Sequence, residues 1–263
     1  MGKALELITG RTVNQAALTA VTFATGDAGT VKAFNPATQA WLMEMWALEA
    51  TAGVARIRSP RMHDNVQNLR FTTVAATPQP LMGDVANQPL YPQDVLIVEL
   101  SGGGAETDVV NYINYYQDLP GTDARLFRWE EIAPRVKNAL TVEVSTTTSA
   151  TAGDYGGAVA LNSLFSTLKA NVDYAVLGYV TNVNCAAVGL RGPDTGNLRV
   201  GGPGSTQRLE TRQWFRDISL WNNVPCIPVI NAANQGATLV DCVHTTASTT
   251  IVVDFTLVEL GPQ

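Results

Sequence analysis

The sequence predicts an all-β protein built from two tandem β-sandwich or β-barrel domains that arose by internal duplication. Segments of the first half recur in the second half, in the same order and about 127 to 133 positions later. Val, Ile, Thr and Tyr lie in short runs that Gly, Pro and Asn clusters separate, as in proteins with many short strands. A length of 263 residues suits two domains of roughly 100 to 130 residues.

The recurring segments form one collinear series, which is harder to obtain by chance than any single match. The matched segments are 26–29 with 153–156, 33–35 with 160–162, 41–43 and Trp46 with 174–176 and Tyr179, 57–60 with 190–193, Asp64 with Asp194, 68–71 with 197–200, and 109–111 with 239–241.

These matches divide the chain into four parts. We expect an N-terminal segment over residues 1–20, a first domain over 21–116, a connector over 117–138 and a second domain over 139–263. The connector has no partner in the repeat. Its aromatic side chains predict that it packs against one or both domains.

Three strands are the most clearly patterned. Residues 95–100 form an apolar run that a Ser-Gly-Gly-Gly segment ends, and residues 140–145 alternate between apolar and polar side chains. Residues 249–259 predict a long final strand with two distinct faces. Many short antiparallel strands in each half suit a sandwich or a barrel.

Helical signals are few. We expect one short helix within residues 4–18 and another over 126–132, which Pro134 would stop. A third is expected over 161–170, where apolar residues recur at helical spacing, with a counterpart over 34–41 in the first copy.

Composition excludes some functions. Charged residues make up 15% of the chain and the net charge is −6. With no basic run, the chain is a poor candidate for direct nucleic-acid binding. The low charge density indicates either a surface buried in a permanent assembly or a soluble surface rich in Thr, Asn and Gln. Cys185, Cys226 and Cys242 are expected as reduced, buried, apolar side chains.

The usual catalytic patterns do not occur in the sequence. His63 and His244 are the only histidines, are not equivalent in the repeat, and are expected in a loop or in the core. There is no His-x-His pair and no Gly-x-Ser-x-Gly elbow. Residues 201–206 and 102–104 look superficially like phosphate loops, but no Walker lysine follows them, so exposed loops with glycines at positive φ are expected.

Four aspartates could in principle supply oxygen ligands for Ca²⁺. These are Asp64 with Asp108 and Asp194 with Asp241. No EF-hand spacing surrounds them, so solvated turn carboxylates are the preferred interpretation. We therefore expect no catalytic, cofactor-binding or metal-binding residues, and no enzyme.

An arginine recurs in a matched loop of each copy, as Arg58 and Arg191. The recurrence of an arginine at this position indicates a structural ion pair in each copy or a contact that both copies make in an assembly. A pair of solvated loop arginines is the remaining alternative.

The chain has an internal duplication, many short runs typical of β-strands and none of the usual catalytic patterns. In these respects it resembles the double jelly-roll major capsid proteins of tailless icosahedral bacteriophages that contain a membrane. The similarity covers the whole chain, but it consists of architecture and of no residue motif. It implies two tandem jelly rolls. The short length implies modest tower loops, for which residues 102–108 and 201–209 are the candidates.

The resemblance also implies a function and partners. Three chains would form a homotrimer with six similar domains around one axis, and such pseudo-hexamers would tile an icosahedral virion shell that assembles in the host cytoplasm. The partners would be further copies of the chain and neighbouring capsomers, with no cofactor. Penton proteins, minor capsid proteins and an underlying viral membrane are left open.

Two other functions compete with this one. The first is a phage decoration or tail protein, or another carbohydrate-binding β protein, in which Trp41, Trp46, Trp214 and Trp221 would stack on sugars if exposed. Core or interface packing is preferred for these tryptophans, because the first two match tyrosines in the second copy. The second is a hydrolytic enzyme on a β scaffold.

Overall fold

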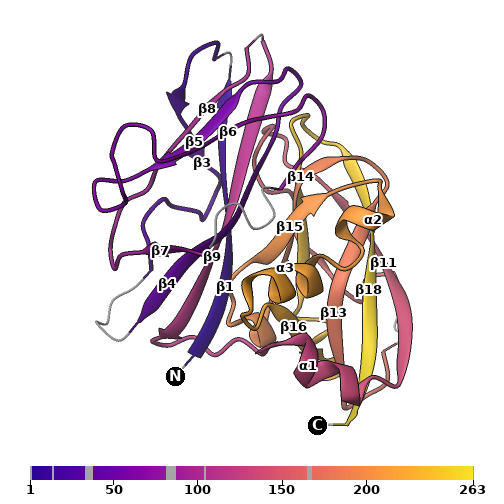
Figure 1. The fold of residues 1–263 in the computed structure, drawn as a ribbon. Helices are drawn as coiled ribbons and strands as arrows, with labels where there is room; N and C mark the ends of the chain where they lie inside the picture. Colours follow the sequence, from indigo (N-terminus) through magenta and orange to yellow (C-terminus); the bar gives the residue numbers. More distant parts are fainter. Residues whose placement is uncertain are drawn as a thin grey trace.

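The computed structural model describes residues 2–13, 15–32, 38–80, 87–103, 105–164 and 168–262. It shows two β sandwiches side by side, the first half of the chain forming one and the second half forming the other (Figure 1). The pairing between named strands is antiparallel throughout, so the predicted all-β class is confirmed.

Two sheets make the first domain. The larger has the strand order β3-β1-β9-β4-β7 and the smaller has the order β2-β8-β5-β6. Their strands are β1 (Gly2–Val13), β2 (Thr19–Ala20), β3 (Thr22–Phe23), β4 (Gln39–Leu48), β5 (Val54–Arg58), β6 (Leu69–Thr72), β7 (Gln88–Leu90), β8 (Ile97–Ser101) and β9 (Thr107–Leu119).

The second domain also has two sheets, with the orders β10-β16-β13-β18-β11 and β12-β17-β14-β15. Their strands are β10 (Leu126–Phe127), β11 (Asn138–Thr147), β12 (Val159–Ala160), β13 (Val172–Thr181), β14 (Cys185–Arg191), β15 (Val200–Gly204), β16 (Ile227–Asn231), β17 (Leu239–Val243) and β18 (Thr250–Pro262). The helices are α1 (Trp129–Ile132), α2 (Arg208–Thr211) and α3 (Trp214–Asn222), with 3₁₀ turns η1 (Ala133–Arg135), η2 (Pro193–Thr195) and η3 (Ala232–Asn234).

The two domains have the same strand connections. When the short strands β3 and β10 are set aside, the eight strands of each domain, counted in chain order, form sheets 1-8-3-6 and 2-7-4-5. This is the jelly-roll arrangement, in which two Greek keys are laid across two facing sheets. The predicted pair of tandem jelly rolls is therefore present.

Local features recur with the topology. Both third strands have a β-bulge against the last strand, at Met43 in β4 and at Leu177 in β13. Asn68 and Asn197 both take positive φ before the fifth strand. Gly26 and Gly153 also take positive φ, although Gly26 follows β3 in the first domain, whereas Gly153 lies between the first and second strands of the second domain. These positions belong to matched segments of the sequence.

Cross-strand pairing shifts two of the matches by one or two residues, because it aligns Trp46 with Val180 and Arg70 with Gly201. One further match joins strands that do not correspond. Residues 109–111 lie in β9, the last strand of the first domain, whereas residues 239–241 lie in β17, the next-to-last strand of the second. Both strands have similar buried apolar residues, and this similarity made the two segments look equivalent. The counterpart of β9 is β18.

The expected N-terminal helix is also wrong. Residues 2–13 form β1, which pairs with β9 along nearly its whole length, so the first jelly roll begins at the start of the chain and not at residue 21. Leu5 and Leu7 point to the second domain, while Ala4 and Ile8 point into the first. Because both faces of β1 are buried, its sequence lacks the apolar–polar alternation that reveals a strand.

The other element predictions have mixed outcomes. Residues 140–145 and most of 249–259 and 95–100 lie in strands, as expected. Residues 126–132 divide into β10 and the short helix α1. Residues 161–164 are turn and bend, and residues 165–167 lie outside the described residues. So do residues 34–37 of the expected helix 34–41, whose end belongs to β4.

The connector packs mainly on the second domain. β10 pairs with β16 and adds a fifth strand to the larger sheet. Arg125 donates to both carboxylate oxygens of Asp173 at 3.0 and 2.6 Å and lies 3.6 Å from Asp194. Ile132 of α1 is fully buried. These contacts confirm the prediction that the connector is packed against a domain.

None of the helices in the described ranges is both long and apolar enough to cross a membrane.

Candidate functional site

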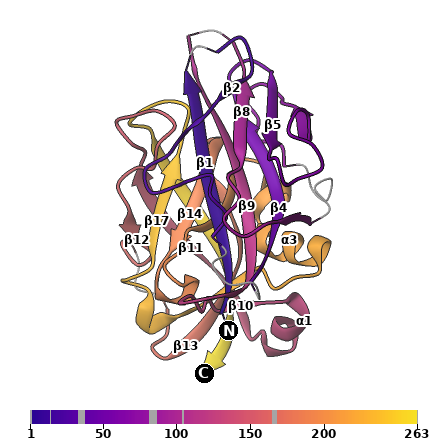
Figure 2. The ribbon, with the colours of Figure 1, turned by 90° about the vertical axis from the view of Figure 1, so that its left-hand side faces the viewer.

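The interface between the two jelly rolls is the most elaborate arrangement of side chains in the described structure. The outward face of β1, β4 and β9 packs against β14, β15 and α3 (Figures 1 and 2). The first domain thus contributes its larger sheet, and the second contributes its smaller sheet and a helix. Because the two sides differ, the contact is heterologous, or head to tail.

Two tryptophans form the apolar centre of this interface. Trp46 of β4 and Trp214 of α3 are fully buried, with their rings edge to face at 5.7 Å. Each indole N–H donates to a backbone carbonyl, Trp46 to Ala186 at 2.7 Å and Trp214 to Gly201 at 2.9 Å. A buried tryptophan with a satisfied N–H contributes strongly to packing.

Small residues let the domains approach closely. A Cβ on Gly201 would lie 2.1 Å from the carbonyl oxygen of Val188 and 2.7 Å from Leu7 of the first domain. A Cβ on Gly202 would lie 2.2 Å from the indole nitrogen of Trp214. The expectation of an exposed loop at residues 201–206 is therefore wrong, because β15 is buried throughout, and residues 201–209 cannot be a tower loop.

Arg199 forms the polar centre of the interface. Its guanidinium donates to Asp241 of its own domain at 3.0 Å and to Asp27 of the first domain at 3.1 Å. The ring of Tyr155 lies beneath it, 3.4 Å from the guanidinium carbon. Burial raises the pKa of Asp27 to about 7, although the Arg199 charge beside it acts in the opposite direction.

Hydrogen bonds extend this cluster into the first sheet. The backbone N–H of Thr9 donates to Asp27 at 2.8 Å, and the Thr9 hydroxyl donates to Asn111 Oδ1 at 2.7 Å. The hydroxyls of Thr9 and Tyr155 lie 2.7 Å apart, and Asn111 donates to the carbonyl of Ala186. The recurring Gly-Asp turns meet here too, since Thr25 donates twice to Asp154 at 2.8 Å.

A cavity of about 150 Å³ lies beside Arg199 at the interface, lined by charged residues of both signs. Lys32 pairs with Glu6, and Arg199 with Asp27, so the charges on its walls neutralise one another. We interpret the cavity as part of a structural ion-pair network.

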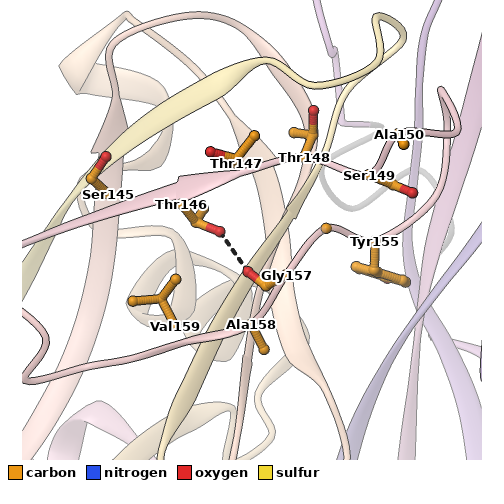
Figure 3. Close-up of a pocket in the computed structure, with 11 residues that line it drawn as sticks. Ser145, Thr146, Thr147, Thr148, Ser149, Ala150, Tyr155, Gly157, Ala158 and Val159 are labelled. Carbon is orange, nitrogen blue, oxygen red and sulfur yellow. Dashed lines mark hydrogen bonds between the residues drawn. The ribbon is translucent and has the colours of Figure 1, made fainter.

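A larger groove of about 670 Å³ opens beside the end of β11 (Figure 3). Its walls are the backbone and small side chains of residues 145–150 and 156–159, with Tyr155 at one side. The Thr146 hydroxyl donates to the carbonyl of Gly157 at 2.9 Å. Hydroxyls and glycines line the groove, and its one titratable side chain, Tyr155, has its pKa raised by burial.

The four aspartates considered for Ca²⁺ have separate structural roles. Asp64 accepts hydrogen bonds from the backbone of Val66 and other residues in its turn, as expected for a turn carboxylate. Asp108, Asp194 and Asp241 are buried, which the sequence did not predict. In the part of the chain that the structure describes, no three His, Cys, Asp or Glu residues are grouped to hold a metal ion.

The structure also places the histidines, the glycines of residues 102–104 and the cysteines. His63 is exposed in a loop, and His244 is half-buried and accepts from the backbone of Thr246 at 2.8 Å, so neither departs from its expected place. Of residues 102–104, Gly103 takes positive φ between β8 and β9, and Gly104 lies outside the described residues. The three cysteines are free and buried, as predicted.

The repeated arginines form one ion pair in each domain. Arg58 lies 2.9 Å from Glu99 of β8, and Arg191 lies 3.7 Å from Asp241 of β17, the corresponding strand. Burial raises the pKa of Glu99, but hydrogen bonds from Arg58 and Arg56 outweigh it and hold the pKa below its ordinary value. The structure therefore supports the first alternative, a structural ion pair in each copy.

Sequence reasoning missed the cluster around Arg199. All of its members except Thr9 nevertheless lie in matched segments, namely Asp27 in 26–29, Asn111 in 109–111, Tyr155 in 153–156, Arg199 in 197–200 and Asp241 in 239–241. The recurrence of charged residues in these matched segments is the sequence signal that could have identified the cluster.

Comparisons with known proteins give only distant structural similarity. No protein-family model and no curated protein matches the sequence. Among solved structures, the PBSX exported protein XepA matches with a TM-score of 0.29 and 10% identity over 97% of this chain and 86% of that one. The STIV major capsid protein matches with a TM-score of 0.22 and 9% identity over 98% and 97%.

A conserved protein of unknown function from Pseudomonas aeruginosa matches with a TM-score of 0.20 and 12% identity, over 98% of this chain and 83% of that one. These scores are too low to define a fold, so the jelly-roll assignment depends on the strand order of this chain.

A pair of buried acids makes stability depend on pH. Burial raises the pKa of Glu49 to about 7 and that of Asp108 to about 6. Carboxyls of an unfolded chain titrate near pH 4, so between about pH 4.5 and 7 the folded protein holds protons that the unfolded chain has released. The free energy of unfolding should therefore increase as the pH falls from 7.5 to 5.5.

Urea unfolding at a series of pH values tests this prediction. Glu49→Gln should reduce the slope, whereas Glu130→Gln on the exposed side of α1 should leave it unchanged. A stability that decreases on acidification over this range would contradict the assignment.

Proposed function

We propose that the protein is a structural subunit of a virion shell, in which three chains form a pseudo-hexameric homotrimer. The observation that supports this most is the heterologous contact between two jelly rolls of the same connectivity. A heterologous contact that is repeated by rotation closes into a ring if the angle allows, and otherwise forms a filament. One chain would supply two of six similar units.

The chemistry of the interface supports a mechanical function. Buried tryptophans and a buried arginine shared by two aspartates make the two domains one building block of fixed geometry. The titratable groups of the interface are bonded to one another. Function in this proposal comes from repeated symmetric contacts between identical chains in the virion, with neighbouring capsomers as partners.

Negative-stain electron microscopy of the purified protein tests the proposal. Threefold particles with six lobes, or closed shells and flat hexagonal sheets at high concentration, are the expected result. Single two-lobed particles at every concentration would overturn it.

A second candidate function, carbohydrate binding by a phage decoration or tail protein, is favoured by one observation. Trp221 at the end of α3 is 63% exposed, and the neighbouring Leu220 is 44% exposed. The other tryptophans are unsuited, because Trp46 and Trp214 are buried and Trp41 stacks on Tyr115. Quenching of tryptophan fluorescence by bacterial surface polysaccharide, abolished by Trp221→Ala, would support this candidate. An unchanged spectrum would exclude it.

A further inference from the structure

Each of the two surfaces that meet inside the chain has an equivalent surface in the other domain, and no domain of the same chain covers that equivalent surface. In the first domain β1 is buried along most of its length, because the second domain covers its outward face, whereas the outward residues of its counterpart β11 are exposed or half-buried. In the second domain β14 and β15 are almost entirely buried. Of their counterparts, β5 alternates between half-buried and buried residues, and β6 alternates between half-buried and exposed ones. The free faces are thus the outward sides of β11–β18 and of β5–β6.

The strand register shows which residues correspond on the larger sheets. The bulges align Asn114 of β9 with Leu257 of β18. Counting from there, the cross-strand pair Thr9–Asn111 corresponds to the pair Glu143–Asp254. Thr9 and Asn111 contact the second domain inside the chain, so Glu143 and Asp254 occupy the same place on the free face.

This correspondence brings two like charges together. Glu143 and Asp254 lie directly opposite each other on adjacent antiparallel strands. Two carboxylates in this position repel each other. Arg212 is exposed and borders a hollow of about 70 Å³ beside Asp254. The face therefore has an excess of negative charge that a cationic partner would relieve.

The register also identifies the opposite face. Arg56 of β5 and Gly189 of β14 both pair with a carboxylate residue of the next-to-last strand, Glu99 and Asp241. Their partners on the fifth strand are Arg70 and Gly201, which therefore correspond.

Gly201 lies against Leu7 of the first domain inside the chain. The counterpart of Leu7 is Thr141, which precedes Glu143 by two residues on the same face of β11. A chain that repeats the internal contact would thus place Arg70 beside Thr141 and within reach of Glu143 of its neighbour.

This second face has an excess of positive charge. Arg70 is exposed and lies directly opposite Arg56, and Arg58 is two residues further along β5. Glu99 pairs with both Arg56 and Arg58, which leaves Arg70 as the uncompensated charge. The two faces that a repeated contact would bring together thus carry net charges of opposite sign.

We propose that the β5–β6 face of one chain docks on the β11–β18 face of a second copy, and that Arg70 pairs there with Glu143 and Asp254. This inference depends on the trimer of the proposed function and specifies its contact. The interface inside the chain has a large apolar centre, with Leu7 and Ile113 where the free face has Thr141 and Thr256. The contact between chains is electrostatic, so salt weakens it.

Charge reversal tests the inference, with native mass spectrometry and sedimentation as the readout. Arg70→Glu and Glu143→Arg each place like charges together and should weaken association about 100-fold or more. The double variant, with both charges exchanged, should restore most of it. Glu130→Arg on the exposed side of α1 is the matched control and should associate like the original chain.

The outcomes separate the inference from the proposed function. If the original chain forms trimers that both reversals leave intact, the contact is wrong and the trimer stands. If the original chain is monomeric at low and high salt, the proposed function fails together with the contact. Loss in each single variant with recovery in the double variant is the result that establishes the pairing. Circular dichroism of each variant shows that loss of association does not come from unfolding.

Discussion

Replacement of Arg199 by methionine is expected to lower the free energy of unfolding by about 3–5 kcal/mol at neutral pH, because removal of one partner leaves buried charges uncompensated. Its side chain is 11% exposed, and those of Asp27 and Asp241 are 5% and 2% exposed. The loss should be smaller at pH 5 than at pH 8, because protonation of the stranded carboxyls removes their charge.

Arg191 supplies the control for this measurement. Its guanidinium approaches the same Asp241 at 3.7 Å, but its side chain is 43% exposed. Arg191→Met should therefore cost less than about 1 kcal/mol in urea unfolding. An Arg199→Met variant that is no less stable than Arg191→Met would show that Arg199 does not hold the two domains together.

Replacement of Trp214 by alanine is expected to cost about 3–5 kcal/mol, as for other fully buried aromatic side chains. Its ring fills the interface against Trp46 and lies over Gly202. Because the two rings touch, a double-mutant cycle with Trp46→Ala should show a coupling of about 0.5–1.5 kcal/mol. Both domains should unfold in a single transition in the original chain.

The control for Trp214→Ala is Trp221→Ala on the same helix. Trp221 is 63% exposed, so its removal should change stability by less than about 0.5 kcal/mol. If the two variants have equal stability, or if the original chain unfolds in two separate transitions, the tryptophan contact does not join the domains.

The sequence revealed the duplication and the fold class because some positions are fixed by local geometry. Asn68 and Asn197 take positive φ, which asparagine tolerates better than most residues. Strand β11 alternates between exposed and buried residues and was predicted correctly, because one of its faces is open.

Other elements were hidden by the interface between the domains. β1 is buried on both faces, so its side chains show no alternation and suggested a helix. Glycines 201, 202 and 204 suggested a loop, but they form a strand against which the other domain packs closely. Both errors have the same cause, a contact between halves that no local pattern records.

The cluster around Arg199 could be predicted only in part. Asp27, Tyr155 and Arg199 lie in matched segments, but Thr9 does not. Thr9 and Tyr155 are separated by 146 positions and meet only through the packing of the domains. Charge pairing across such a separation depends on the strand register, which the structure supplies.

The claim that the two jelly rolls are units of a closed ring is tested most directly by the mass of the original chain in solution. Native mass spectrometry at low ionic strength should show a species of three times the mass of the chain, which dissociates as salt is added. A species that stays at the mass of one chain at every concentration and salt level, or one with a number of chains other than three, would contradict the account.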